Sequence, residues 1–214
     1  MKKLIAFDLD GTLLDTAEDL LVCANETFDK YGYKRVDKKS VQAANGKDAH
    51  SYMRVLIGDV SYEEIERIWP YYINLILTKG ADKTQLFEGL EQVLFELKNK
   101  GYILTILTNK SPEEMPIFID KILHKLPFDE IQAVGGGEDA KPSPKSMLAL
   151  LEKYGIEKKN AFIVGDGEPD IITAINAGIN SIGVLWGNRS KDQLAQVGAT
   201  TFASKPSELL DIIG

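Results

Sequence analysis

The sequence of 214 residues predicts an α/β fold in which helices cover both faces of a mostly parallel, doubly wound sheet. Short apolar runs alternate with helical patterns of about a dozen residues along most of the chain, which is typical of βαβ units. The segment 15–84 breaks this alternation, because it shows helical patterns and no convincing strand. We therefore expect a sheet domain that carries one all-helical insertion after its first strand.

The predicted strands are short apolar runs. The first is LIAF at residues 4–7, which ends at Asp8. Three later runs resemble it: YILTILTN from Tyr102, AFIVGDG from Ala161 and SIGVLWG from Ser181. A weaker candidate, IQAVGGG, begins at Ile131.

Helices between these strands are marked by apolar stripes and by end signals. One stripe with helical spacing is formed by Leu90, Val93, Leu94 and Leu97. Gly101 follows it at a position where glycine is favoured after a helix. The segment 111–114, Ser-Pro-Glu-Glu, supplies an N-cap, a first-turn proline and a capping-box glutamate. Pro169 opens another predicted helix, which Gly178 closes.

The insertion contains at least two amphipathic helices. The apolar face of the first is formed by Leu20, Leu21, Ala24, Phe28 and Tyr31. Ser61 and Glu64 form a capping pattern at the start of the second, which Pro70 is expected to kink. We expect residues 1–14 and 85–214 to form a Rossmann-like core, and residues 15–84 to form a helical cap domain.

Composition narrows the function classes. The formal net charge of -7 argues against nucleic acid or an anionic membrane as the main partner, since both require a positive field. The single cysteine, Cys23, excludes an intramolecular disulfide, and its apolar neighbours predict a packed, inert thiol. The apolar run before Asp8 is too short for a signal peptide, and no segment approaches a membrane span of about 20 apolar residues. We expect a cytoplasmic protein.

Polar residues follow three predicted strands at the point where each strand ends. Asp8 and Asp10 follow the first, Thr108–Asn109 ends the second, and Asp166 follows a later one. Ligands bind outside the carboxyl ends of the strands in an open parallel sheet, so these groups are expected to converge. Lys141, at the entrance of another helix, can bring a cation to the same edge.

The converging carboxylates predict a metal ion. Three converging carboxylates would repel one another and raise one another's pKa values unless a cation neutralised them. Hard oxygen ligands without a His or Cys cluster favour Mg²⁺. With Mg²⁺ and Lys141, an acidic protein can hold a small anionic phosphate.

This set of motifs resembles the haloacid dehalogenase superfamily. The four matching segments are Asp8-Leu9-Asp10-Gly11-Thr12, Thr108-Asn109, Lys141 and Gly165-Asp166 to Asp170. The resemblance covers essentially the whole chain, because the helical insertion lies where that superfamily has a small cap. Cap domains of this kind open and close, and the hinges are expected near Leu14–Asp15 and Lys83–Thr84.

The resemblance implies roles for the residues of the first motif. Asp8 is the expected nucleophile, which forms an aspartyl-phosphate, and Asp10 is the expected general acid and base. Gly11 and Thr12 are expected to contact the substrate. Mg²⁺ would be held by the Asp8 carboxylate, the Asp10 backbone carbonyl and Asp166.

The remaining motifs complete the implied site. Thr108 is expected to donate its hydroxyl to the phosphoryl oxygens, with support from Asn109. Lys141 would offset the charge of the nucleophile and stabilise the transition state. Asp170 is expected to orient the groups that hold the metal.

Within the superfamily, the chain resembles the phosphoglycolate phosphatase branch. An aspartate at position 10 favours phosphoester chemistry over dehalogenation or phosphonate cleavage, and Leu20 stands where sugar-phosphate mutases have a histidine. The stretch DTAEDLLVCAN at residues 15–25 and the late segment VLWGNRSKDQLAQVGAT match the branch. The resemblance implies a Mg²⁺-dependent phosphatase acting on a small phosphorylated metabolite, with phosphoglycolate as the first candidate.

Other functions stay open at this point. Within the enzyme class they are an inorganic pyrophosphatase and a broad-specificity phosphatase for sugar phosphates or nucleotides. A different class is a binding or regulatory protein that keeps this scaffold without catalysis. A monomer or a weak homodimer is expected.

The cap offers a candidate for reading the far end of the substrate. Lys47, His50 and Arg54 are spaced i, i+3, i+7, which would place them on one helical face. That face could bind a carboxylate or a second phosphate. The alternative is a basic face that only contacts solvent.

Overall fold

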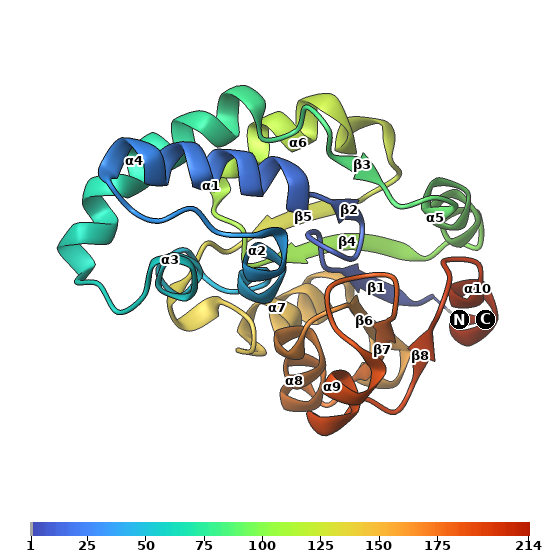
Figure 1. Ribbon diagram of the computed structural model, residues 1–214. Helices are drawn as coiled ribbons and strands as arrows, with labels where there is room; N and C mark the ends of the chain where they lie inside the picture. Colours follow the sequence, from blue (N-terminus) through green and yellow to red (C-terminus); the bar gives the residue numbers. More distant parts are fainter. Residues whose placement is uncertain (1) are drawn as a thin grey trace.

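The computed structural model describes residues 2–214, and its centre is a six-stranded parallel sheet (Figure 1). The strands lie in the order β5-β4-β1-β6-β7-β8, and every neighbouring pair is parallel. Their bounds are β1 Leu4–Phe7, β4 Ile103–Thr108, β5 Glu130–Ala133, β6 Ala161–Gly165, β7 Asn180–Val184 and β8 Phe202–Ala203. The predicted α/β class is confirmed, and the weaker candidate strand at Ile131 is real.

Helices cover both faces of the sheet. The side chains of the central strand β1 point alternately to the two faces, and all of them are buried. Leu4 and Ala6 of β1 pack in a cluster with residues of α7 (Lys145–Tyr154) and α8 (Glu168–Ala177). Ile5 and Phe7 point to the opposite face. The helices on that face are α5 Leu90–Asn99, α6 Met115–Lys121 and α10 Glu208–Ile213.

The helix ends follow the signals in the sequence. Gly101 has a φ of 79° just beyond α5, and Gly178 closes α8 in the left-handed conformation. The capping box of Ser111 and Glu114 is present, at a 3₁₀ turn over Pro112–Glu114 that runs into α6.

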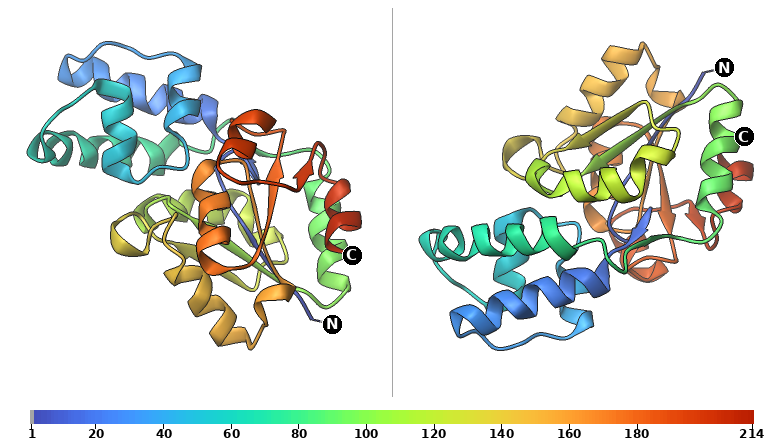
Figure 2. Two further views of the ribbon diagram at one scale, coloured as in Figure 1. Left: turned by 90° about the horizontal axis from the view of Figure 1, so that it is seen from below. Right: turned by 90° about the horizontal axis from the view of Figure 1, so that it is seen from above.

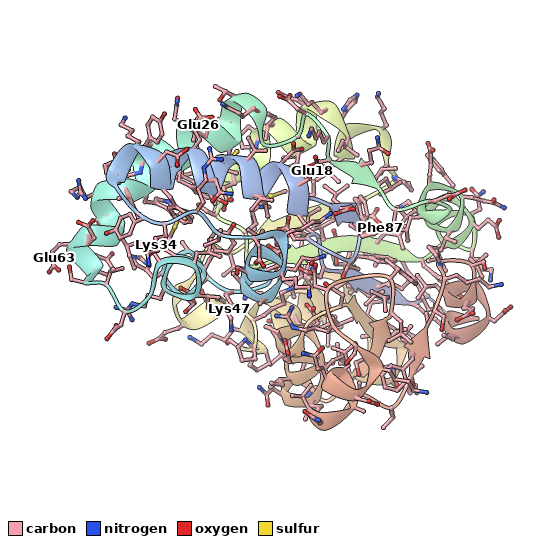
Figure 3. All side chains as sticks on the ribbon, viewed as in Figure 1. Glu18, Glu26, Lys34, Lys47, Glu63 and Phe87 are labelled. Carbon is pink, nitrogen blue, oxygen red and sulfur yellow. The ribbon has the colours of Figure 1, made fainter. Side chains whose placement is uncertain are left out.

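Four helices between β2 and β3 form the cap (Figure 2). They are α1 Ala17–Tyr31, α2 Lys38–Ala44, α3 Ala49–Ile57 and α4 Tyr62–Lys79. Their apolar faces meet at buried residues such as Phe28, Ile65 and Tyr72, while Lys34 and Glu63 project from the surface (Figure 3). Pro70 lies inside α4. The cap core is continuous with that of the sheet domain, since α4 also packs on α6.

The chain passes into and out of the cap through two adjacent segments. The short strands β2 (Leu14–Asp15) and β3 (Gln85–Leu86) pair antiparallel. The buried Asp19 side chain accepts hydrogen bonds from the backbone N–H groups of Lys83 and Thr84, at 2.8 and 2.7 Å. The predicted hinges lie at this junction, and both the hinge positions and the domain limits at 15 and 84 stay predictions.

The remaining elements are short and lie at the periphery. They are α9 Lys191–Gln196 and the 3₁₀ turns Leu123–Lys125, Gly137–Asp139 and Lys158–Asn160. Cys23 is buried, and burial raises the pKa of its thiol to about 12, as a packed, inert thiol requires. Among the described residues, none of the helices is long and apolar enough to cross a membrane.

Candidate active site at the carboxyl edge of the sheet

The predicted polar groups converge at the carboxyl ends of three adjacent strands. Asp8 and Asp10 follow β1, Thr108 ends β4 and Asp166 follows β6. Because β1 lies between β4 and β6 in the sheet, the three strand ends are neighbours. All four side chains are buried.

Lys141 connects two of the carboxylates. Its Nζ lies 2.7 Å from Oδ1 of Asp8 and 2.6 Å from Oδ1 of Asp170. Burial acts to lower the pKa of the Lys141 ammonium, but the carboxylates of Asp170 and Asp8 raise it above its ordinary value. Burial raises the pKa of Asp8 well above its usual range, and the charges of Asp170 and Asp166 add to this effect, while Lys141 opposes it. Lys141 is therefore a fixed positive charge beside Asp8.

Asp166 is held by three hydrogen bonds. Thr12 donates its hydroxyl to Oδ1 at 3.1 Å, and Asn188 donates its backbone N–H and its side-chain amide to Oδ2 at 2.6 and 2.9 Å. Burial and the charge of Asp170 nevertheless raise the pKa of Asp166 to about 6, because the three hydrogen bonds offset only part of the free energy lost by removing the carboxylate from water. Asn188 was not predicted from the sequence. Its only sequence signal is its place directly after the Trp-Gly pair that follows β7.

Two glycines allow the carboxylates to lie this close to the backbone. A Cβ on Gly165 would lie 2.2 Å from Cγ of Asp170, and a Cβ on Gly11 would lie 2.4 Å from Oδ2 of Asp166. Any side chain at either position would displace a carboxylate. Gly11 also has a φ of 90°, which turns the chain sharply after Asp10.

Asp8, Asp166 and Asp170 form a cradle that suits a divalent cation. One carboxylate oxygen from each residue lies within 4.8 Å of the other two. The donor set is entirely oxygen, as Mg²⁺ prefers, and the single positive charge of Lys141 offsets only part of the charge of three carboxylates. The residues present therefore fit the ion that the sequence predicts.

Asp10 has partners that the sequence analysis missed. Its Oδ1 accepts a hydrogen bond from Thr16 at 2.6 Å, and its Oδ2 lies 3.2 Å from Nζ of Lys110. Lys110 Nζ also lies 3.4 Å from Glu114, and both side chains are buried. Burial acts to lower the pKa of Lys110, but Asp10 and Glu114 raise it. The only sequence signal for Lys110 is its place directly after Thr108–Asn109.

Asn109 joins three parts of the structure. Its side chain accepts a hydrogen bond from the Lys141 backbone N–H at 2.7 Å and donates to the Lys141 carbonyl at 2.8 Å. It also donates to the carbonyl of Gly46 in the cap at 2.9 Å. Asn109 therefore positions Lys141 and contacts the cap, and Thr108 accepts the Lys110 backbone N–H at 3.1 Å.

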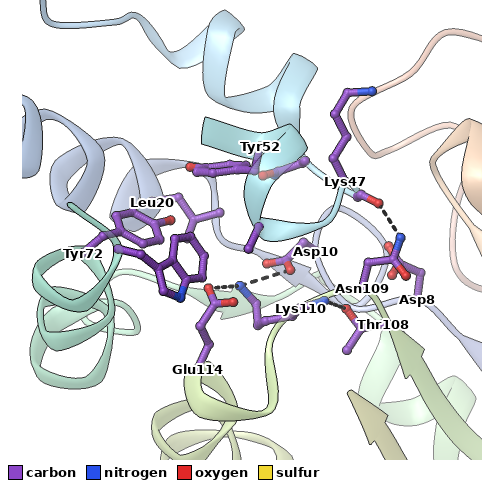
Figure 4. Close-up of a pocket in the computed structure, with 14 residues that line it drawn as sticks. Asp8, Asp10, Leu20, Lys47, Tyr52, Tyr72, Thr108, Asn109, Lys110 and Glu114 are labelled. Atoms are coloured by element: carbon purple, nitrogen blue, oxygen red, sulfur yellow. Dashed lines mark hydrogen bonds and ion pairs between the residues drawn. The ribbon is translucent and has the colours of Figure 1, made fainter. Parts of the chain in front are cut away.

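A small cavity of about 30 Å³ lies in front of Asp8 and Asp10, between the sheet edge and the cap (Figure 4). The core lines it with the two aspartates and the segment Thr108–Lys110 together with Glu114. The cap lines it chiefly with Leu20, the turn Asn45–Lys47, and the aromatic residues Tyr52, Trp69 and Tyr72. Gly11 and Thr12, which were expected to contact the substrate, are not among the residues that line it, and the Thr12 hydroxyl is directed to Asp166.

The expected shared face of Lys47, His50 and Arg54 is wrong. Helix α3 begins at Ala49 after the Asp48 N-cap, so Lys47 belongs to the preceding turn. His50 stacks on Tyr62 of the neighbouring helix with ring centroids 4.4 Å apart, and Arg54 is exposed. Lys47 alone reaches the cavity, and its ammonium points away from Asp8 and Asp10 (Figure 4). The structure does not bring the other two to the site.

Comparisons of sequence identify the family of the chain. A family model described as haloacid dehalogenase-like hydrolase matches residues 5–184. The phosphoglycolate phosphatase of Vibrio cholerae is 30% identical over 220 residues, which cover 99% of this chain and 96% of that protein. The phosphoglycolate phosphatase of Xanthomonas campestris is 31% identical, over 88% of this chain and 85% of that protein.

Comparisons of structure give the same picture. A predicted phosphoglycolate phosphatase from Haemophilus somnus superposes with a TM-score of 0.85 at 26% identity, over 100% of this chain and 98% of that one. A predicted phosphatase from Clostridium acetobutylicum gives a TM-score of 0.83 at 28% identity, with the same coverage.

Proposed function

The chain belongs to the haloacid dehalogenase-like hydrolase family and is a phosphoric monoester hydrolase, and we propose that its substrate is phosphoglycolate. The proposed reaction is Mg²⁺-dependent and passes through an aspartyl-phosphate on Asp8. The observation that carries the proposal is the convergence of Asp8, Asp166 and Lys141 from separate elements onto one buried edge below the cap.

The proposed chemistry uses two aspartates of one strand end. An oxygen of Asp8 attacks phosphorus, and the bond from phosphorus to the leaving oxygen breaks while Asp10 gives that oxygen a proton. Water then attacks the aspartyl-phosphate, and Asp10 takes the proton from it. The hydrogen bond from Thr16 fixes one oxygen of Asp10, and the other oxygen lies beside Lys110.

The charges around Asp8 support this role. Lys141 offsets the negative charge of the nucleophile Asp8, and the Asn109 side chain fixes the backbone of Lys141. Asp8, Asp166 and the backbone carbonyl of Asp10 would hold Mg²⁺, with Asp170 within reach of the same position. The ion supplies positive charge that allows a phosphate dianion to approach this acidic edge.

Two observations support a small substrate with phosphoglycolate as the first candidate. The cap covers the cavity with Tyr52, Trp69 and Tyr72, which leaves little room for a nucleotide. Relatives that span nearly the whole chain are phosphoglycolate phosphatases.

A substrate screen tests the proposal. Release of phosphate from 2-phosphoglycolate, pyrophosphate, sugar phosphates and nucleoside monophosphates is measured with Mg²⁺ and ranked by kcat/KM. We expect 2-phosphoglycolate to rank first and activity to vanish when the metal is chelated. Pyrophosphate in first place would indicate a pyrophosphatase, similar rates for many esters would indicate a broad-specificity phosphatase, and no release from any would reject the enzyme.

Asp8→Asn tests the nucleophile separately. We expect turnover to fall by more than about a thousand-fold, because the amide cannot form the acyl-phosphate. Asp82→Asn, at an exposed carboxylate paired with Lys121, is the control and should behave as the wild type. An Asp8→Asn variant that matched the wild type would contradict the aspartyl-phosphate and favour a different site.

A further inference from the structure

A second buried lysine, Lys110, lines the cavity. Lys110 is buried, and its Nζ lies between Asp10 and Glu114 (Figure 4). The proposed chemistry at phosphorus assigns it no role. Its position next to Asp10 places it where the leaving group of the substrate departs.

The contacts of the two lysines differ in a way that matters for binding. Lys141 makes contacts of 2.7 and 2.6 Å to two carboxylates, whereas Lys110 makes longer contacts of 3.2 and 3.4 Å. Lys141 does not line the cavity, but Lys110 does. Lys110 therefore has capacity for a further acceptor that comes from the cavity.

Glu114 holds Lys110 in this place. The Oε2 atom of Glu114 accepts the Ser111 backbone N–H at 2.9 Å in the capping box, while its Oε1 atom faces Lys110. Because Ser111 fixes the Glu114 carboxylate, Glu114 in turn holds the Lys110 ammonium in place. The ammonium therefore lies at the cavity before any ligand binds.

The cap contributes a donor to the same cavity. The hydroxyl of Tyr52 is buried and makes no hydrogen bond of ordinary geometry within residues 2–214, and the Tyr72 hydroxyl is its neighbour. A buried hydroxyl without a partner is unfavourable, so such groups are normally satisfied. Tyr52, on α3, lines the same cavity as Lys110, and its hydroxyl can donate a hydrogen bond to a ligand there.

We propose that Lys110 and Tyr52 form a subsite for a carboxylate on the leaving group of the substrate. The proposal rests on the phosphatase function and predicts a preference for phosphoglycolate. In that molecule a single methylene separates the ester oxygen, which must face Asp10, from the carboxylate. Lys110 is adjacent to Asp10, which fits this short separation. Lys110 and Tyr52 are thus specificity-determining residues, one from the core and one from the cap.

Paired substrates test this subsite. Ethyl phosphate replaces the carboxylate of 2-phosphoglycolate with a methyl group and keeps the ester. The quantity measured is the ratio of kcat/KM for 2-phosphoglycolate to kcat/KM for ethyl phosphate. We expect Lys110→Met to lower this ratio about 30-fold, as loss of one charge-assisted hydrogen bond predicts, mainly through KM for 2-phosphoglycolate. Tyr52→Phe should lower it about 5-fold.

The control is Lys153→Met, at an exposed lysine paired with Glu130 on the outside of the core, and its ratio should equal that of the wild type. Thermal unfolding shows whether each variant is folded. Tyr52→Phe removes one hydroxyl and no charge, so it decides the question if Lys110→Met does not fold.

The outcomes separate the subsite from the function it rests on. Equal losses for both esters in Lys110→Met would mean that the lysine only positions Asp10, and would overturn the subsite. An unchanged ratio in Lys110→Met, or in Tyr52→Phe if that variant alone folds, would also overturn it. A wild-type enzyme with no preference for 2-phosphoglycolate would instead reject phosphoglycolate as substrate, and with it the subsite.

Discussion

The sheet edge and the cap enclose one cavity, but they hold their polar groups in different ways. At the sheet edge, Asp166 accepts three hydrogen bonds, and Lys141 contacts both Asp8 and Asp170. On the cap side, the Tyr52 hydroxyl has the Tyr72 hydroxyl as a neighbour but makes no hydrogen bond of ordinary geometry with the described residues. The edge is thus organised before a substrate binds, while the cap has hydrogen-bonding capacity left for a ligand. This difference indicates that the edge performs the chemistry and the cap contributes to selecting the substrate.

If the edge performs the chemistry, removing its fixed cation should have the largest effect. We expect Lys141→Met to lower kcat about a thousand-fold, because Asp8 and the transferring phosphoryl group lose a preorganised positive charge. The variant is also expected to unfold at lower temperature, since two buried carboxylates lose their partner. Phosphate-release kinetics with 2-phosphoglycolate measure the first effect, and calorimetry measures the second.

Lys145→Met is the matched control for that variant. Lys145 lies on the same segment, is exposed, and pairs only with the nearby Glu138 and Asp139. We expect wild-type kcat from it. A folded Lys141→Met variant with wild-type kcat would show that the edge does not depend on this charge.

The carboxylates of the edge should make Mg²⁺ binding dependent on pH. The pKa of Asp166 is raised to about 6, so below pH 6 the metal must displace a proton from this group. We expect the apparent affinity for Mg²⁺ to fall up to about tenfold per pH unit there for each proton released. Isothermal titration with Mg²⁺ between pH 5 and 7.5 measures it, and an affinity that is constant over this range would contradict the assignment.

The same shift has a consequence for the metal-free protein. A carboxyl whose pKa is raised by folding binds more protons in the folded state than in the unfolded chain. The free energy of unfolding therefore falls as pH rises from the ordinary pKa of an aspartate toward 6. Mg²⁺ should offset that loss. The increase in melting temperature on adding Mg²⁺ is therefore expected to be larger at pH 7 than at pH 5.

The smallest effect is expected where the core only holds the cap. Arg189, after β7, donates to the carbonyls of Gln42 and Ala43 in the cap at 2.8 and 3.1 Å, and also pairs with Glu168. We expect Arg189→Gln to raise KM roughly 3- to 10-fold with little change in kcat, because the closed cap loses about two hydrogen bonds. A change in kcat without a change in KM would place Arg189 in the chemistry.

Arg35→Gln is the control for this prediction. Arg35 is an exposed arginine of the cap, and its ion pair with Asp29 lies within the cap. Exposed pairs of this kind contribute little, so KM should equal the wild-type value.

Most of the edge could be predicted because its signals are local. An apolar run followed by Asp8, and a Gly-Asp pair after another run, specify both a strand and the side chain that it delivers. Strands of two residues could not be predicted, since β2, β3 and β8 are too short to show any periodicity.

The cavity itself depends on contacts distant in sequence. In the sequence, Lys110 looks like an exposed lysine in a turn. It is buried because α4 packs against α6 and the 3₁₀ turn that precedes α6, and this contact is distant in sequence. The error at Lys47 was avoidable, because Asp48 is a good N-cap and predicts a helix that starts after it. The direction of His50 toward Tyr62 was not avoidable, as it depends on how α3 packs on α4.

Trapping the proposed covalent intermediate tests the central claim most directly. An Asp10→Asn variant keeps the nucleophile and lacks the group that activates water, so the aspartyl-phosphate should accumulate. Acetyl phosphate is the substrate, because its leaving group needs no proton from Asp10. We expect intact mass spectrometry to show one added phosphoryl group, and peptide mapping to place it on Asp8. No adduct, or an adduct on another residue, would contradict the account.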